Sequence, residues 1–323
     1  MTPRSRIHEY PSATVAVLSC SRPARLAALV ERVTAQTVAP DDVLVIWSAP
    51  EPLVGSFHCG PSVRVVTIAA AEFGHGKTRN LALRKTARDI LVLITDDAWP
   101  ADDRWLAQLL RPFVERPSVA AVFGRQVVDA AASPDAVFRE ARYPATSFAI
   151  ELGPDRVLDL ARMPISNASA AYRVPALRAV GGFQEDLLAS EDIGAAVSLL
   201  DAGHAVWYAG DSRVFHSHRY DFVSQIRRTF DMATSQRQLC GKLRLRMPGI
   251  GGYLPLLRSL SRARRHTSWR GRLALGADLG ARAVGVVLAR LSPLMPRPML
   301  RRVSAQRWFY AHSATSTSVD RVP

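Results

Sequence analysis

The chain has 323 residues, of which 48% are hydrophobic, so it is long enough for one large domain or two smaller ones and can bury a sizeable core. This composition excludes a disordered chain. The formal net charge of +14 arises at one end, because residues 1–236 carry 25 basic and 26 acidic side chains, whereas residues 237–323 carry 17 and 2. We therefore predict a globular body over residues 1–236 and a basic region over residues 237–323 that suits phosphate-rich partners.

The cysteines and the apolar runs bear on the compartment. Three cysteines at wide spacings, Cys20, Cys59 and Cys240, predict neither a disulfide framework nor a cysteine-rich zinc module. The apolar run at residues 15–18 is short for a secretory signal, and no run approaches the roughly 18 apolar residues that indicate a transmembrane helix. We therefore expect a cytoplasmic protein.

The first half of the body predicts strands that alternate with helices. Strands are expected at residues 14–18, 43–47, 63–68 and 90–94, and helices at residues 26–33 and 78–89. This alternation is typical of a parallel, doubly wound sheet. Ligands bind such sheets at the carboxyl ends of the strands, so the residues after Leu18, Trp47 and Ile94 are the first candidates for a site.

The second half of the body continues the pattern less regularly. A helix is expected at residues 105–110 and another at 192–202, with strands at 119–123, 168–174 and 205–208. Residues 129–162 are the least periodic part of the body. We expect them to form a loop region that could lie over a site.

The basic region is predicted to contain an amphipathic helix over residues 272–291. Its polar side chains fall within an arc of roughly 120° when each residue turns about 100°. The polar arc contains Arg272, Asp278, Arg282 and Arg290, and the predicted apolar face consists of Leu279, Ala283, Val286 and Val287. Such a helix is better suited to lying on a membrane than to crossing it. The alternative is a helix that packs on the body and keeps a charged face in solvent.

Two groups of side chains are candidate metal ligands. Thr95, Asp96 and Asp97 directly follow the buried strand at residues 90–94. Carboxylates at the carboxyl edge of a parallel sheet suit Mg²⁺ or Mn²⁺, with water and substrate phosphates in the remaining positions. His216 and His218 lie on one face if their segment is extended, so one imidazole could complete a divalent-metal site. The alternatives are acidic loop or cap residues and surface histidines.

Residues 73–80 read FGHGKTRN and open a predicted helix. Backbone N–H groups at a helix start, joined by Lys77 and Arg79, would form a cradle for a diphosphate. The segment lacks the spacing of the nucleotide-binding P-loop, which disfavours an ATPase. The alternative is a glycine turn with solvated basic residues.

Glu191 and Asp192 begin a predicted helix after the turn at Gly181 and Gly182. Either carboxylate could cap that helix by accepting a hydrogen bond from its free N–H groups. If one of them instead reaches a pocket, it could take a proton from an attacking hydroxyl, as a general base does.

Taken in chain order, these segments resemble the inverting family 2 glycosyltransferases of the GT-A fold, and within that group the bacterial rhamnosyltransferases. The resemblance covers roughly residues 12–235. Its most specific parts are FGHGKTRN at 73–80, ITDDAWP at 94–100, SNASAAYR at 166–173, GGF at 181–183 with SEDI at 190–193, and VFHSHRYDF at 214–222 leading into RRTFDMA at 227–233. It implies an α/β fold of the GT-A type, with a doubly wound, mostly parallel sheet and a basic, amphipathic helical C-terminal extension.

The resemblance also implies roles for individual residues. Asp192 corresponds to the catalytic base, and Glu191 beside it to a supporting or acceptor-side residue. Asp97 corresponds to the metal-binding acid, and His216, with His218 as the alternative, to the late histidine beside the metal. Donor contacts are expected from Ser19, Arg22, His75, Lys77, Arg79, Asn80 and Asp96.

The implied reaction moves a sugar, with rhamnose as a candidate, from a nucleoside-diphosphate donor to a hydroxyl of a cell-envelope glycan or lipid-linked acceptor. The configuration at the sugar inverts, and a divalent metal, Mg²⁺ or Mn²⁺, is the expected cofactor. We expect the enzyme to be cytoplasmic and peripheral on the inner face of the cell membrane, where its basic helices meet anionic lipid.

Two departures from the family pattern keep other functions open. Trp47 and Ser48 stand where relatives have an aspartate after the second strand, and Lys77 stands where a second glycine is usual. These changes leave a catalytically inactive GT-A-like scaffold as an alternative. A nucleic-acid-binding protein would explain the basic end, but residues 237–323 contain no recognisable zinc or RNA-binding motif, so we expect no nucleic acid partner.

Overall fold

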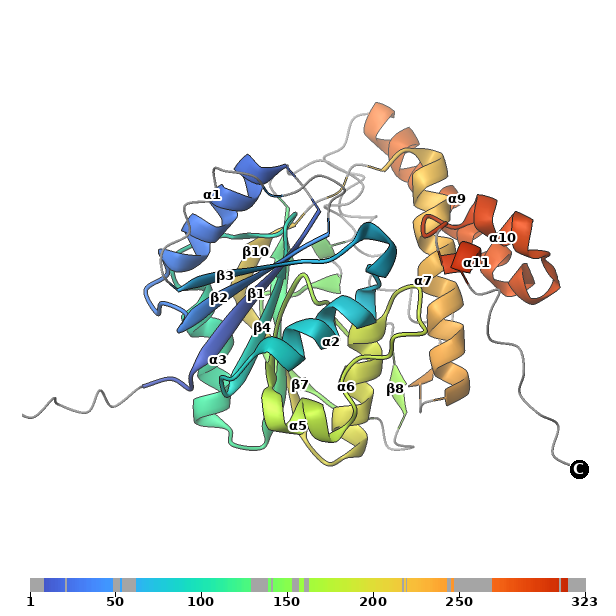
Figure 1. Cartoon of the computed structure of the whole chain (residues 1–323). Helices are drawn as coiled ribbons and strands as arrows, with labels where there is room; N and C mark the ends of the chain where they lie inside the picture. The colour runs from blue at the N-terminus through green and yellow to red at the C-terminus, as the bar shows by residue number, and fades with distance from the viewer. Residues whose placement is uncertain are drawn as a thin grey trace, which may run out of the picture.

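The computed structural model describes most of the body and the last helices of the chain. Its described residues are 9–20, 22–48, 53, 62–128, 139–140, 142–152, 157–159, 163–216, 218, 220–242, 245–246, 269–307 and 309–312. Within them, helices cover both faces of a central sheet, and a further group of helices lies beside it (Figure 1).

The described part of the chain contains one large mixed sheet and one small strand pair. The strands of the large sheet are β1 (Ala13–Ser19), β2 (Asp42–Trp47), β3 (Val63–Thr67), β4 (Ile90–Thr95), β5 (Trp99–Pro100), β6 (Val119–Val127), β7 (Phe148–Ile150), β9 (Ser169–Arg173) and β10 (Ala205–Phe215). Their order is β3-β2-β1-β4-β9-β6-β10-β5, and β7 also pairs with β10. The small pair is formed by β8 (Leu158–Asp159) and β11 (Leu245–Arg246).

The large sheet consists of two parallel groups that are joined by one antiparallel strand. Strands β3, β2, β1 and β4 are parallel to one another, and β6 is parallel to β10. Strand β9 runs antiparallel to both β4 and β6. The predicted doubly wound, mostly parallel sheet is therefore confirmed, and its central strands are buried on both faces, as their continuous apolar runs require.

Helices on the two faces of the sheet define two cores. Helices α1 (Pro23–Thr34) and α3 (Trp105–Glu115) cover one face, and α2 (His75–Lys85), α5 (Val174–Ala179) and α6 (Glu191–Asp201) cover the other. Alternate residues of β1 point to opposite sides: Val15 and Val17 pack with α1, whereas Ala16 and Leu18 belong to the core below α2 and α6. Trp47 is buried in the first of these cores.

The differences from the predicted elements lie mainly in short segments. The short strands β5, β7, β8 and β11 were not predicted, because two or three residues show no periodicity. Helix α2 begins at His75, after the short 3-10 helix at Ala70–Glu72. The predicted loop region at residues 129–162 contains β7 and β8, while residues 129–138, 141, 153–156 and 160–162 lie outside the described residues.

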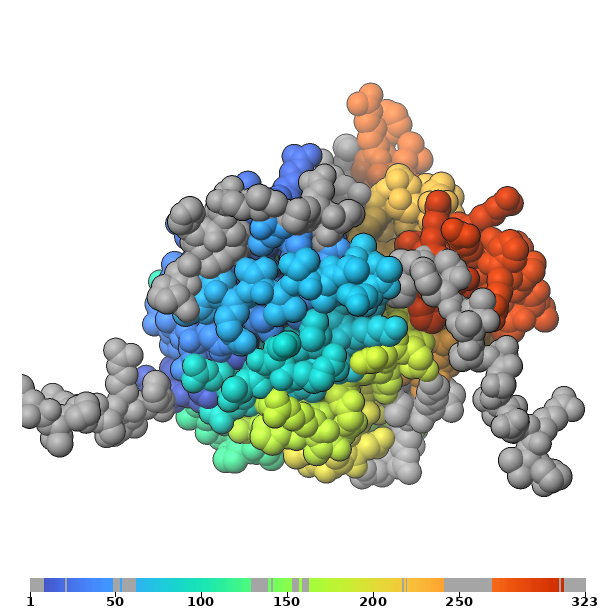
Figure 2. Space-filling view, in the orientation of Figure 1, coloured from blue at the N-terminus to red at the C-terminus, as the bar shows by residue number. Residues whose placement is uncertain are grey.

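The C-terminal helices form a lobe beside the body (Figure 2). They are α7 (Phe222–Lys242), α9 (Trp269–Leu291), the 3-10 helix at Ser292–Leu294, α10 (Arg297–Val303) and α11 (Phe309–His312). Helix α9 lies along α7 (Figure 1). Helix α7 is continuous across residues 236 and 237, so the predicted boundary between the two parts falls within one helix. Among the described helices, none combines the length and the hydrophobicity needed to span a bilayer.

The packed face of α9 differs from the predicted apolar face. Its buried residues are Ala281, Gly285 and Ala289, which recur every four positions, whereas Val287 is 52% exposed. A Cβ atom on Gly285 would lie 2.7 Å from Cβ of Thr229 and 2.8 Å from a backbone oxygen of α7. Small side chains therefore allow the two helices to approach closely. The predicted apolar face was wrong, because at about 100° per residue Leu279 and Val286 fall within the arc of the polar residues.

The close contact between α9 and α7 predicts opposite effects at two glycines. Gly285→Ala should lower the free energy of unfolding by about 1–3 kcal/mol, because backbone atoms of α7 must move to admit the new methyl group. Gly280→Ala is the matched control: nothing lies within 4 Å of its Cβ position, so it should stabilise the helix by about 0.5–1 kcal/mol. Urea unfolding of both variants tests this, and equal stabilisation by both would contradict the contact.

Candidate active site

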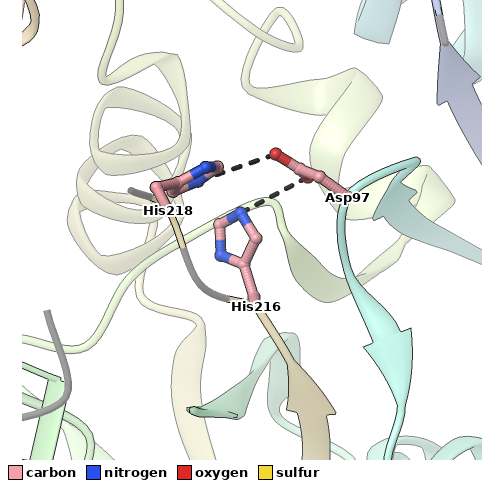
Figure 3. A group of neighbouring side chains, drawn as sticks. All are labelled: Asp97, His216 and His218. Carbon is pink, nitrogen blue, oxygen red and sulfur yellow. Dashed lines mark ion pairs between the residues drawn. The ribbon is translucent and has the colours of Figure 1, made fainter. Parts of the chain in front are cut away.

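Asp97, His216 and His218 converge at one edge of the sheet (Figure 3). Oδ1 of Asp97 lies 3.3 Å from Nε2 of His216, and Oδ2 of Asp97 lies 3.6 Å from Nε2 of His218. Strand β5 explains this proximity, because Trp99 pairs with Phe215 and so holds the turn after β4 beside the end of β10. The candidate ligand atoms of the three side chains all lie within 4.8 Å of one another.

The imidazole of His216 is oriented by Gln126. Nδ1 of His216 lies 2.8 Å from Oε1 of Gln126, and Arg139 donates a hydrogen bond to the same oxygen. Nδ1 is also 3.2 Å from Nη1 of Arg139, so this nitrogen is turned toward Gln126 and Arg139, and the other ring nitrogen, Nε2, faces Asp97. Oδ1 of Asp97 is buried and accepts no hydrogen bond. A cation between Nε2 and Oδ1, either a proton or a metal ion, would satisfy both atoms.

The charges of this cluster favour an ionised Asp97. Burial acts to raise the pKa of the Asp97 carboxyl, but the imidazole of His216, 3.3 Å away, outweighs burial and holds this pKa well below its usual range. Burial, followed by the charge of His216, lowers the pKa of His218 to about 4. One carboxylate and two imidazoles form a donor set that divalent metals accept.

Glu191 and Asp192 occupy the first turn of α6. The preceding residue, Ser190, has a φ of 67°, a left-handed conformation that costs a non-glycine residue roughly 1–2 kcal/mol. Asn167 contacts both acids: its backbone N–H donates to Oδ2 of Asp192 at 3.2 Å, and its side-chain amide donates to Oε1 of Glu191 at 3.1 Å. The hydroxyl of Tyr172 donates to Oδ1 of Asn167 at 2.6 Å and so fixes the amide.

The two neighbouring carboxyls have opposite pKa shifts. Burial raises the pKa of Asp192 to about 7, and the negative charge of Glu191 adds to this effect. Burial also acts to raise the pKa of Glu191, but Arg79, whose Nη1 is 3.1 Å from Oε1 of Glu191, lowers it overall. Glu191 is therefore ionised at neutral pH, while Asp192 exchanges a proton there, which is the separation expected of a supporting acid and a general base.

A cavity of about 610 Å³ connects the acid pair with the histidines. Glu191, Asp192, His216 and His218 all line it, and Asp97 contacts both histidines. The structure thus brings the predicted base and the predicted metal ligands to one place. His75 and Arg79 line the same cavity, as do Arg139, Arg142 and Tyr143 from the region predicted to form a loop over a site.

Ser19, Asp96 and Arg22 lie near the end of β1. The hydroxyl of Ser19 donates to Oδ2 of Asp96 at 2.8 Å, and the backbone N–H of Cys20 donates to the same atom at 3.0 Å. Arg22 is exposed at the start of α1. None of these residues is among the described residues that line the cavity, but Asp96 is the neighbour of Asp97 in the cluster with His216 and His218.

The FGHGKTRN segment forms the beginning of α2 and its contacts are mostly internal. A Cβ atom on Gly76 would lie 2.0 Å from the backbone oxygen of Gln184, so this glycine permits close packing. The side chain of Asn80 donates to the backbone oxygen of Phe183 at 2.8 Å and accepts from its N–H at 2.9 Å. Lys77 is exposed. The donor roles of these residues remain predictions, since their described contacts are to the protein.

Several residues of the site were not predicted to have a role. Asn167 and Tyr172 lie within SNASAAYR, so the motif itself was the signal that could have identified them. Gln126 gave no signal, because it lies near the end of a largely apolar strand and in none of the recognised motifs. Gln306, from the basic region, lines the cavity, and its side-chain nitrogen is 2.9 Å from Nε2 of His75.

The buried pair of Arg79 and Glu191 predicts a large effect on stability. Arg79→Met should lower the free energy of unfolding by about 3–5 kcal/mol at neutral pH, because it leaves the Glu191 carboxylate buried without its cation. The double variant Arg79→Met with Glu191→Gln should recover part of this loss. Urea unfolding measures both, and an equal loss in the single and double variants would show that Glu191 does not depend on Arg79.

The sheet topology and the site place the chain in the class of GT-A glycosyltransferases. It belongs to the family described as glycosyltransferase-like family 2, whose model matches residues 11–235. A solved structure with the same fold is a mannosyltransferase from Pyrobaculum calidifontis in complex with GDP-Man and Mn²⁺. It has a TM-score of 0.55 and 18% identity, over 94% of this chain and 86% of that chain.

Two curated relatives with higher identity are rhamnosyltransferases. The O-antigen chain rhamnosyltransferase RfbN of Salmonella typhimurium is 32% identical over 209 residues, which are 63% of this chain and 65% of the relative. The O-antigen chain rhamnosyltransferase WbaN of Salmonella anatum is 31% identical over 198 residues, 61% of this chain and 62% of the relative. The matched region therefore spans slightly less than two thirds of these relatives. The predicted family, and the resemblance to rhamnosyltransferases, are confirmed.

Proposed function

We propose that the chain is an inverting glycosyltransferase that moves a sugar, with rhamnose as the first candidate, from a nucleoside-diphosphate donor to a hydroxyl of a cell-envelope glycan or lipid-linked acceptor. The observation that carries the proposal is Asp192, a buried carboxyl with a pKa of about 7 that lines one cavity with His216 and His218. The family and its rhamnosyltransferase relatives support the choice of sugar.

Asp192 acts as the general base in this proposal. Its carboxylate takes the proton of the acceptor hydroxyl, and the oxygen attacks the anomeric carbon on the face opposite the nucleoside diphosphate, which leaves with the bonding electrons. The sugar configuration inverts. Asn167 and Arg79 position the base, because Asn167 donates to Asp192 and Glu191, and Arg79 holds Glu191 ionised beside them.

Asp97, His216 and His218 are the proposed ligands of a divalent metal, Mg²⁺ or Mn²⁺. The buried Oδ1 of Asp97 that accepts no hydrogen bond, and the Nε2 atom of His216 that faces it, fit such an ion. When bound, the metal would neutralise charge on the donor diphosphate. Gln126 would fix the orientation of His216, as hydrogen-bonding partners of metal-bound histidines do.

The donor is proposed to bind at the carboxyl ends of β1 and β4. Ser19 and Asp96 are linked there beside the metal cluster, with Arg22 at the start of the neighbouring helix. The remaining proposed donor residues lie on α2: His75 and Arg79 line the cavity, where the donor would meet the acceptor, and Lys77 and Asn80 lie elsewhere on the helix. The donor occupies the side of Asp97 that carries Asp96, and the acceptor occupies the cavity that Asp192 lines.

We also propose that the chain lies on the cytoplasmic face of the cell membrane. Apolar side chains are exposed on the C-terminal lobe, with Leu294 84% and Met299 45% exposed, and Arg297 is exposed nearby. Each Lys or Arg near an anionic leaflet adds roughly 1 kcal/mol of attraction. Flotation with vesicles that contain anionic phospholipid should recover the wild type, and Leu294→Glu with Met299→Glu should lower the bound fraction. Equal flotation of both forms would contradict this orientation.

The proposed activity can be tested by binding and turnover. Calorimetry across a panel of nucleoside-diphosphate sugars should identify a donor, and release of nucleoside diphosphate should then require an acceptor and Asp192. If the donor binds but no cell-envelope extract supplies an acceptor that supports turnover, the result would favour the inactive scaffold. A panel in which no nucleoside-diphosphate sugar binds would contradict the proposal.

A further inference from the structure

A second cavity, of about 680 Å³, lies among the C-terminal helices. It is lined almost entirely by arginine, and we call it the arginine groove. Its lining residues are Arg227, Arg297, Pro298, Arg301, Arg302, Arg307 and Tyr310. The guanidinium groups come from α7, from α10 and from the segment that follows α10. No carboxylate is among the described residues that line the groove.

Several arginines elsewhere in the described chain pair with carboxylates. Arg64, Arg213 and Arg282 each lie within 4 Å of a carboxylate. Among the described residues, no such ion pair is recorded for Arg227, Arg301, Arg302 or Arg307. The guanidinium groups of Arg227, Arg301, Arg302 and Arg307 repel one another, and an anion bound among them would relieve this repulsion.

Acidic side chains near the arginine groove offset only part of its charge. Asp221, just before α7, is exposed and interacts electrostatically with Arg227, and Asp231 interacts with Tyr310. Oδ2 of Asp231 accepts hydrogen bonds from the backbone N–H groups of Ala305 at 2.9 Å and Gln306 at 3.2 Å. Burial raises the pKa of Asp231 to about 6, so part of its charge is lost near neutral pH. The other described acid of the lobe, Asp278, pairs with Arg282 at 2.7 Å. The groove therefore keeps a net positive charge.

The arginine groove adjoins the proposed acceptor cavity. Arg227 and Arg307 line both cavities. Ser304, Ala305 and Gln306, from the same segment as Arg307, also line the cavity that contains Asp192. This segment is held by its bonds to Asp231 and by the contact between Gln306 and His75. One molecule could therefore place a hydroxyl at Asp192 and an anionic group among the arginines.

The chemistry of guanidinium identifies the kind of anion. Arginine forms paired, charge-assisted hydrogen bonds with phosphate oxygens, and a group of five can match the several oxygens of a phosphate or diphosphate ester. We propose that the arginine groove binds the phosphate or diphosphate ester that joins the acceptor glycan to its lipid carrier. This inference rests on the proposed function, since it assumes that the acceptor occupies the cavity lined by Asp192.

The test compares two double variants that remove the same charge. Arg301→Gln with Arg302→Gln changes the groove. Arg270→Gln with Arg272→Gln is the control. These two residues lie at the start of α9, and Arg272 is about 28 Å along the helix, at a rise of about 1.5 Å per residue, from its last residue, Leu291, which leads toward α10 and the groove. Both variants lower the net charge of the lobe by two, so a general loss of charge affects them equally.

The expected result is a change in acceptor preference. With the donor saturating, kcat/KM is measured for a lipid-diphosphate-linked glycan and for the same glycan as a phosphate-free alkyl glycoside. The groove variant should lose about tenfold or more of the preference for the diphosphate-linked acceptor, as expected when charged hydrogen bonds are removed. The control should keep that preference. An equal loss in both variants, or an unchanged preference in the groove variant, would overturn the proposal.

A binding measurement separates this proposal from the proposed function. Inorganic pyrophosphate, titrated calorimetrically without divalent metal, should bind the wild type and the control several-fold more tightly than the groove variant. This measurement needs no turnover. If the wild type binds pyrophosphate in the groove but transfers no sugar, that result would contradict only the proposed function. If only vesicle flotation, or only retention of duplex DNA, depends on Arg301 and Arg302, the groove binds phospholipid headgroups or nucleic acid and the proposal is wrong.

Discussion

Asp192→Asn is expected to lower kcat by about 10²–10⁴-fold, the range that a positioned general base contributes. The asparagine keeps the size of the side chain and can still accept the hydrogen bond from the backbone N–H of Asn167, but it cannot take a proton from the acceptor hydroxyl. Asp201→Asn is the matched control: Asp201 is exposed at the other end of α6, so its removal should leave kcat unchanged. Full activity of Asp192→Asn would remove Asp192 from the mechanism.

The pH dependence should carry the same signature. A base with a pKa of about 7 is active only when deprotonated, so kcat/KM should fall tenfold for each pH unit below 7 and level off above it. The pH dependence of kcat/KM is measured at acceptor concentrations well below KM, where it reports the pKa of the free enzyme. A profile that stays flat between pH 5 and pH 8 would contradict the assignment, because the enzyme would then work with Asp192 protonated.

Asp192→Asn should raise the stability of the fold although it lowers the activity. The pKa of Asp192 is raised by burial, so ionisation of this carboxyl opposes folding above its unfolded value of 3.8, and the penalty is complete above about pH 7. The urea concentration at the midpoint of unfolding should therefore be higher for Asp192→Asn than for wild type at pH 8, and nearly the same for both near pH 3.5. Such a variant, inactive but more stable, would separate loss of catalysis from loss of fold.

The fold was predictable where burial imposes a continuous pattern. The strand at Ile90–Thr95 is apolar at every buried position because its neighbours cover both faces, and such runs are visible in one sequence. Strand β5 contains only Trp99 and Pro100, and its pairing with β10 depends on residues far away in the chain. Yet this short pairing brings Asp97 to His216, so the feature that assembles the site was the least predictable one.

The residues of the site were predictable to different degrees. Asp97, Asp192 and His216 lie in motifs, whereas Gln126 and the pairing of Arg79 with Glu191 depend on contacts between distant segments. The basic region was expected to meet a membrane, but Gln306 and its neighbours also form part of the cavity wall. Net charge identifies a type of partner and does not say which cavity the charged segment lines.

Loss of the metal site is expected to have the second large effect. Removal of divalent metal by a chelator should abolish transfer, and added Mn²⁺ or Mg²⁺ should restore it. Asp97→Asn should weaken Mn²⁺ binding by at least about 100-fold, because a neutral amide replaces the carboxylate of the cluster. Calorimetric titration of Mn²⁺ measures this without requiring turnover. Asp96→Asn is the matched control, since Asp96 is the adjacent acid but is not among the clustered ligands, and it should bind Mn²⁺ nearly as tightly as wild type.

Gln126→Leu extends the same prediction to the residue that orients His216. Leucine cannot form the hydrogen bond between Gln126 and Nδ1 of His216. The imidazole therefore loses its fixed orientation, and its Nε2 atom is no longer held toward Asp97. Metal affinity should fall about 10–100-fold, as it does when such partners are removed. High Mn²⁺ should then restore activity to Gln126→Leu but not to Asp97→Asn. If both variants bind Mn²⁺ like wild type, the three side chains form an ion-paired cluster that holds the turn after β4 to the end of β10 and do not form a metal site.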